Sequence, residues 1–133
     1  MSNRSLTASK PLARIVLFLW IAIIIWLSLD PSPPVPDTGI PGWDKLLHAA
    51  AYGCLTVFGG WSLPGTPPVA VSRWLLVGFA AITFGGIMEV MQNVITNTRT
   101  ADLCDLAANA VGVCIVFLAV FIRRKTRRKT VDH

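Results

Sequence analysis

Charged side chains are scarce in this chain of 133 residues, where Asp, Glu, Lys and Arg together make up 14% of the sequence. In soluble domains these four residue types make up roughly 25%. Hydrophobic residues, in contrast, make up 53% of this chain. The shortage of charge excludes an ordinary soluble domain and indicates a membrane protein, and the length suits one small domain over residues 1–133.

Cysteine and histidine are also few. The three cysteines, Cys54, Cys104 and Cys114, lie in apolar surroundings without a Cys-x-x-Cys spacing, which excludes a disulfide scaffold and favours packing roles. Of the two histidines, only His48 lies in an apolar segment. A site built from several histidines is therefore excluded there. We expect neither a metal ion nor a cofactor, and we keep a metal site only as an alternative.

The basic residues are concentrated at the C-terminus, although the net charge of the whole chain is only +5. Six of the twelve Lys and Arg residues lie in "RRKTRRK", residues 123–129. Such a run can bind nucleic acid, but it follows an apolar segment directly. We therefore interpret residues 123–133 as a basic cytoplasmic tail facing anionic lipid, and we expect no nucleic-acid partner.

Four apolar segments are each near the roughly 20 residues that an α-helix needs to cross a bilayer. They predict an all-α, polytopic integral membrane protein with four transmembrane helices in a small bundle, at about residues 12–29, 43–63, 74–94 and 103–122. The first segment can also be read as a signal peptide, but no small-x-small cleavage site follows it. Before the last segment, Thr100 or Asp102 is positioned to cap the helix.

Lys and Arg also predict the orientation. With a cytoplasmic N-terminus, ten of the twelve basic residues lie on the cytoplasmic side and only Lys45 and Arg99 lie outside. The positive-inside rule favours this topology, with both termini cytoplasmic. It brings the start of the second helix, the end of the third and the start of the fourth to the extracytoplasmic level.

Polar residues recur at helical spacing at this level. Asp44, His48 and Tyr52 follow one another at intervals of four, and Glu89 and Gln92 are three apart. Ala81 and Gly85, and then Ala108 and Gly112, share the faces of the acids, so these faces are expected to turn toward one another. The candidate binding residues are Asp44, Lys45, His48, Tyr52, Glu89, Gln92, Arg99, Asp105 and Asn109.

Three motifs resemble those of the VanZ-like family: Asp-Lys-x-x-His from Asp44, Glu-x-x-Gln from Glu89, and Arg99 followed by Asp-x-x-x-Asn-x-x-Gly ending at Gly112. The resemblance covers roughly residues 40–120. It implies a small helical protein of the bacterial cytoplasmic membrane. It also implies a link to the cell envelope, because the namesake of the family is associated with resistance to the glycopeptide teicoplanin. The resemblance does not indicate that the protein catalyses any particular reaction.

Three functions are compatible with these residues. In the first, the polar residues bind an amphiphile, such as a lipid-linked envelope ligand, or a partner, beyond the surrounding membrane lipid; a purely structural network is its simplest form. In the second, the protein is an intramembrane enzyme acting on a lipid-linked envelope substrate, with catalytic candidates His48, Asp44, Glu89 and Asp105. In the third, these same four residues hold a metal ion. We favour the first, because no serine or cysteine is placed to pair with His48.

Overall fold

The computed structural model describes residues 9–34, 38–63, 71–95 and 102–131, with side chains described from residue 10 to residue 126 within these ranges. All the regular secondary structure in these ranges is α-helical, as predicted. The four helices are α2 (Ser9–Leu29), α3 (Trp43–Ser62), α4 (Val71–Ile95) and α5 (Leu103–Val131). Each lies over one of the apolar segments, so the prediction of a four-helix bundle is confirmed.

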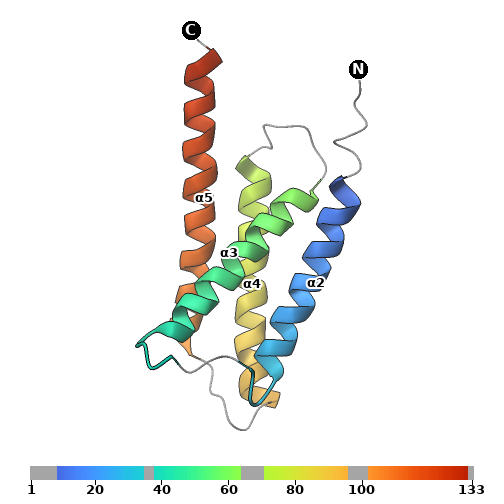
Figure 1. Ribbon diagram of the computed structural model, residues 1–133, viewed down its shortest axis with the longest axis vertical. Coiled ribbons are helices and arrows are strands. Elements are labelled where there is room, and N and C mark those ends of the chain that lie inside the picture. Colours follow the sequence, from blue (N-terminus) through green and yellow to red (C-terminus); the bar gives the residue numbers. More distant parts are fainter. Residues whose placement is uncertain (1–8, 35–37, 64–70, 96–101, 132–133) are drawn as a thin grey trace.

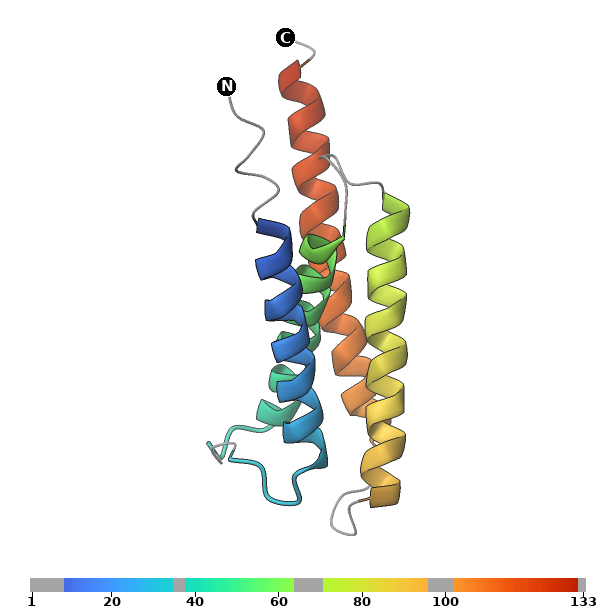
Figure 2. The ribbon, with the colours of Figure 1, turned by 90° about the vertical axis from the view of Figure 1, so that its right-hand side faces the viewer.

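The helices run up and down, and α3 lies among the other three (Figures 1 and 2). α3 contacts α2, α4 and α5, whereas α2 and α5 do not contact each other. α2 begins and α5 ends at the same end of the bundle, and α3 and α5 begin at the other (Figure 1). The latter end, where α2 and α4 also finish, contains most of the candidate residues, and we refer to it as the polar end.

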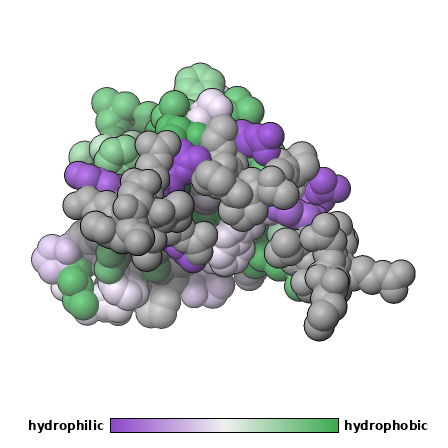
Figure 3. Space-filling view, turned by 90° about the horizontal axis from the view of Figure 1, so that it is seen from above, coloured by the Kyte–Doolittle hydropathy of each residue, from purple (hydrophilic) through white to green (hydrophobic). Residues whose placement is uncertain are grey.

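Large hydrophobic side chains cover the outside of the bundle. Phe18 is 68% exposed, Phe79 72% and Phe121 63%, on α2, α4 and α5 respectively. Viewed along the bundle from the end opposite the polar end, hydrophobic side chains lie at the outer edge (Figure 3). These three helices are long and apolar enough to cross a membrane. Such an exterior suits hydrocarbon and would be unfavourable in water, which supports a membrane location.

The interior contains polar as well as apolar side chains. The most completely buried side chains are Val113, Asn109 and Thr56, and the buried set includes hydrophobic residues such as Leu55 and charged ones such as Glu89. A charged side chain is rarely fully buried in a soluble domain. In a membrane, lipid is as apolar as a leucine side chain, so close backbone approach and hydrogen bonds hold the helices together.

The closest approach is between α3 and α5. A Cβ atom added at Gly112 would lie 2.0 Å from the carbonyl oxygen of Ala49, so only glycine fits there. Gly85 on α4 likewise lies against the side chains of Asn109 and Tyr52. The predicted alignment of small residues with the polar faces is therefore confirmed at both positions.

The ends of the helices have identifiable causes. The carboxylate of Asp102 accepts a hydrogen bond from the backbone N–H of Cys104 at 2.8 Å, so Asp102 caps α5. Thr100, the other predicted cap, lies outside the described residues. α3 begins after Gly42, whose φ of 78° is left-handed and favours glycine. α5 continues to Val131, nine residues beyond the predicted span, because Arg and Lys favour helix and no Gly or Pro interrupts them.

Candidate functional site

Lys45 is the centre of an ionic cluster at the polar end. Its ammonium group lies 2.9 Å from a carboxylate oxygen of Asp44, 2.6 Å from one of Asp102 and 2.5 Å from one of Asp105. We call Asp44, Lys45, Asp102 and Asp105 the ionic cluster. It joins the first turn of α3 to the start of α5. Lys45 therefore does not extend outward to water, because three carboxylates hold its ammonium group.

The electrostatics of the cluster are clearest at Asp102, which precedes the membrane-spanning part of α5. The hydrogen bond from Lys45, and then the one from the backbone N–H of Cys104, lower the pKa of Asp102 below its usual value. Both donors favour the ionised carboxylate. Asp102 is therefore a carboxylate at neutral pH, and its charge links α5 to α3.

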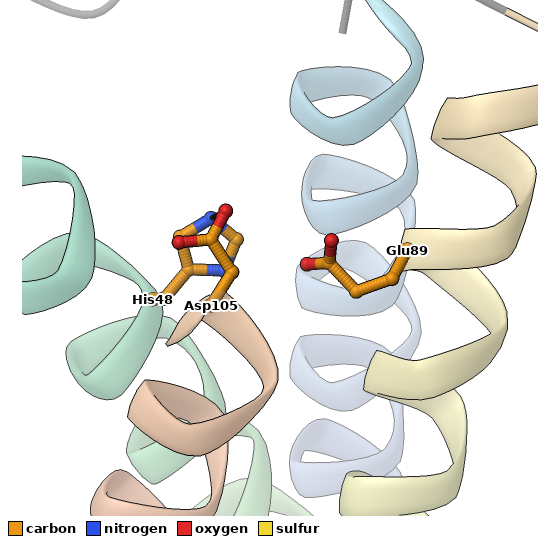
Figure 4. A group of neighbouring side chains, drawn as sticks. All are labelled: His48, Glu89 and Asp105. Carbon is orange, nitrogen blue, oxygen red and sulfur yellow. Dashed lines mark ion pairs between the residues drawn. The ribbon is translucent and has the colours of Figure 1, made fainter. Parts of the chain in front are cut away.

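A second group of side chains lies beside the ionic cluster and comes from three helices. His48 of α3, Glu89 of α4 and Asp105 of α5 each offer one nitrogen or oxygen atom, and these atoms lie within 4.8 Å of one another. Figure 4 shows the Glu89 carboxylate directed across the interior toward His48 and Asp105. We call these three residues the His48 group. Helical spacing had predicted their common level, and the structure brings them together.

Hydrogen bonds orient the side chains of His48 and Glu89. His48 Nδ1 lies 3.1 Å from Oδ1 of Asn109, whose side chain is fully buried. Glu89 is 6% exposed and accepts a hydrogen bond from the backbone N–H of Asp102 at 3.2 Å. Asn109 thus holds the imidazole ring in place. Because the side chain of Asn109 is fully buried and cannot turn away, it is a positioning residue for His48.

Gln92 and Tyr52 take part in the contacts between helices and not in the ionic cluster. The amide of Gln92 donates to the backbone carbonyl of Ser28 on α2 at 2.9 Å, so it connects α4 to α2. Tyr52 is 3% exposed and its ring packs against Phe84 of α4. Both predicted residues are therefore part of the helix packing, and both also border the groove described next.

A groove of about 700 Å³ lies between α2 and α3. Its walls are mainly apolar and include Trp20, Ile24 and Leu47, whereas Asp44, His48 and Gln92 contribute polar groups. The indole N–H of Trp20 donates to the carbonyl of Ala51 at 2.9 Å and so fixes one wall. The groove therefore combines a hydrocarbon-like lining with polar groups from the same faces that carry the motifs.

The structure places eight of the nine candidate residues at or next to the polar end. Arg99, the ninth, lies outside the described residues. Asp44 is the most peripheral, with a side chain that is 62% exposed, and it is not a member of the His48 group.

Sequence reasoning missed the contribution of α2. Trp20 and Ser28 carry no motif, yet one forms a wall of the groove and the other receives the hydrogen bond of Gln92. The available signals were weak: a tryptophan in the middle of a transmembrane segment, and a serine near its end.

Comparisons with known proteins identify no relative. No family model matches the chain, no curated protein matches it, and no solved structure matches it.

Proposed function

We propose that this chain is a VanZ-like integral membrane protein of the cell envelope that binds an amphiphile in the groove between α2 and α3. The observation that carries the proposal is the groove itself, with its apolar walls and its polar groups from His48, Asp44 and Gln92. Its volume falls within the roughly 300–1,000 Å³ of small-molecule sites. The motif residues that resemble the VanZ-like family support the same location, because His48 and Gln92 border the groove.

The two kinds of lining select the ligand class. A solute that is polar throughout would lose its hydration against Trp20 and Leu47. A pure hydrocarbon would displace water from the polar side chains of His48 and Asp44 without replacing its hydrogen bonds. A molecule with one acyl or polyprenyl chain and a polar head group matches both. The acyl or polyprenyl chain of the ligand then lies along the apolar walls, and its head group lies beside His48.

The charges favour a head group with hydroxyl or amine groups. The exposed carboxylate of Asp44 offers hydrogen-bond acceptors to the groove, and the ammonium of Lys45 is already held by three carboxylates. A carboxylate can accept further hydrogen bonds from donors of the ligand. A lipid-linked envelope ligand has this chemistry, and the envelope link of the VanZ-like family agrees with it.

The proposed location is the bacterial cytoplasmic membrane, with the polar end on the extracytoplasmic side and both termini in the cytoplasm. The distribution of Lys and Arg supports this orientation, and so does the position of the start of α2 and the end of α5 at one end of the bundle. Reporter fusions after His133 test it. An alkaline phosphatase fusion should be inactive and a green fluorescent protein fusion should be bright; the reverse result would overturn the orientation.

Tryptophan fluorescence tests the groove. Trp20 borders it, whereas Trp26 on the same helix is 57% exposed on the outside of the bundle. Two variants would each retain only one of these tryptophans, with the others changed to Phe. Lysophosphatidylethanolamine with a brominated acyl chain, which carries one chain and an amine, should quench Trp20 saturably in detergent. It should quench Trp26 only in proportion to its mole fraction.

A blocked groove provides the matched control. Ala50 borders the groove with an exposed side chain, so Ala50→Phe should fill it without disturbing the core. This change should abolish the saturable quenching of Trp20 and leave that of Trp26 unaltered. Equal, non-saturable quenching of both tryptophans in the unblocked protein would refute the proposal.

A further inference from the structure

We infer that His48, Glu89 and Asp105 form a binding site for one divalent transition-metal ion, with zinc and manganese as the ions that suit it. The three residues come from three different helices, and one ligand atom from each lies within 4.8 Å of the other two. The inference concerns this group alone and holds whether or not the groove binds an amphiphile.

The hydrogen bonds around His48 and Asp105 leave one imidazole nitrogen and one carboxylate oxygen available to a metal ion. Nδ1 of His48 faces Oδ1 of Asn109, which places the ring hydrogen on Nδ1 and leaves the lone pair on Nε2. Oδ1 of Asp105 accepts a hydrogen bond from the ammonium of Lys45, and Oδ2 of Asp105 faces the imidazole. Metal-binding histidines almost always donate their second N–H in this way, and ligating carboxylates are similarly held by a neighbour.

Glu89 supplies the second, independent indication of a ligand. Its side chain is 94% buried, being 6% exposed, and one carboxylate oxygen accepts the N–H of Asp102. The carboxylate is directed toward His48 and Asp105 (Figure 4). A buried carboxylate is costly to keep ionised, and a cation between the three side chains would lower that cost.

The distance between His48 and Asp105 also suits a shared ion. Nε2 of His48 lies 3.6 Å from Oδ2 of Asp105, which is too long for a hydrogen bond. Two ligands that bind one tetrahedral ion at about 2.1 Å are about 3.4 Å apart. This pair therefore already has the spacing of two metal ligands, and a carboxylate oxygen of Glu89 lies within 4.8 Å of both.

The ligand atoms indicate the kind of ion. One imidazole nitrogen and two carboxylate oxygens suit zinc or manganese, whereas calcium and magnesium prefer oxygen ligands alone. Three protein ligands leave at least one coordination position open. Because His48 also borders the groove, that position is available to a head-group oxygen; this last step rests on the proposed function, and the metal site does not.

Metal binding is measured on the full chain, purified in detergent through a tag without histidine. Co²⁺ reports the site by its visible absorption, and equilibrium dialysis against Zn²⁺ and Mn²⁺ gives the stoichiometry. We expect about one ion per chain, and affinity reduced about tenfold or more in His48→Gln, Glu89→Gln and Asp105→Asn. Asp30→Asn is the matched control: it also removes a carboxylate, just after the end of α2, but one outside the His48 group, the ionic cluster and the groove lining, and it should bind normally.

A spectroscopic measurement keeps the test decisive if a variant does not fold. In the His133→Ala background, His48 is the single histidine of the chain. Electron spin echo modulation of bound Mn²⁺ should then show coupling to an imidazole nitrogen. Absence of binding of all three ions, undiminished binding by His48→Gln, or bound Mn²⁺ without nitrogen coupling would each overturn the inference. The groove is tested separately, by repeating the fluorescence experiment in excess chelator.

Discussion

The polar end and the opposite end of the bundle are held together by different interactions. At the polar end, Lys45 joins α3 to α5 through carboxylates. At the opposite end, aromatic side chains pack directly against glycines. A Cβ atom added at Gly60 would lie 2.3 Å from the ring of Trp74, and one added at Gly78 would lie 2.5 Å from the ring of Phe117. One end therefore depends on charge and the other on shape.

The difference separates an end rich in ionisable groups from an end held by close packing. Ionisable groups within a membrane protein are costly, so the cluster and the His48 group need a scaffold that holds them. Close packing between glycines and aromatic rings supplies such a scaffold without any polar atom. Because the two ends use different interactions, substitutions, pH and salt should affect them differently.

The largest effect is expected where α3 and α5 cross, because both ends depend on that contact. Gly112→Ala would place a methyl group 2.0 Å from the carbonyl oxygen of Ala49, so the helix backbones must separate. Overpacking typically costs about 1–3 kcal/mol, and a backbone clash belongs at or above the top of that range. Thermal unfolding in detergent should show a large fall in the midpoint, or the protein should not accumulate.

Gly86→Ala is the control for that change. The nearest atom to a Cβ at Gly86 is Cδ1 of Leu106, at 4.0 Å, so the methyl group fits. Its midpoint should be unchanged or slightly higher, because alanine favours helix over glycine. Equal destabilisation by both substitutions would contradict the α3–α5 contact.

Removal of the central cation should weaken the polar end selectively. Lys45→Met leaves Asp102 and Asp105 close together without their shared partner. The lysine side chain is 33% exposed, so we expect a loss of about 1–2 kcal/mol, below the roughly 3–5 kcal/mol for a fully buried pair. Chemical unfolding measures it. Lys125→Met, an exposed lysine near the end of α5, should change stability little, and Asp102→Asn combined with Lys45→Met should recover part of the loss.

A smaller effect is expected from pH. The pKa of Asp102 is lowered in the folded protein, chiefly by Lys45, so its contribution is fully present above its usual pKa of 3.8 and is lost as pH falls through the lower, folded value. The unfolding midpoint should therefore fall as the solution is acidified below about pH 4, and this part of the fall should be absent in Asp102→Asn. An identical acid profile in both proteins would show that the charge of Asp102 is not coupled to folding.

The smallest effect is expected at the opposite end. The ammonium of Lys10 donates to the carbonyl oxygens of Trp61 and Leu63, at 3.1 Å and 2.9 Å, and so satisfies the last turn of α3. Lys10→Met should lower stability by about 1 kcal/mol or less, because water can replace the ammonium there. The same unfolding assay measures it, and a loss larger than that of Lys45→Met would reverse the ranking of the two ends.

Much of the fold was predictable because the membrane requires it. A backbone in hydrocarbon must satisfy its own hydrogen bonds, so four apolar segments of about 20 residues had to become helices. Helical spacing also indicated which residues cluster. Asp44 and His48 share one helix face, and Glu89 and Asp105 belong to helix ends at the same level. The basic run after residue 122 was less clear, because composition alone does not say where a helix of good helix formers ends.

The partners of the polar residues required the tertiary structure. Spacing along one helix defines a face, but it does not say which atom on another helix that face meets. Lys45 could extend to water or turn inward, and only the positions of Asp102 and Asp105 at the start of α5 turn it inward. The groove depends in the same way on Trp20 of α2, a helix without any motif.

By itself, the sequence determined the membrane environment, the four helices and the level of the polar residues, because these follow from local hydrophobicity and helical periodicity. The tertiary structure decided which polar atoms pair and which stay free. Gly112 allows α5 to approach α3 closely, and that approach brings Asn109 to Nδ1 of His48 and Asp105 to the other side of the ring. Such pairings depend on distances between helices, and a linear pattern of residues does not contain them.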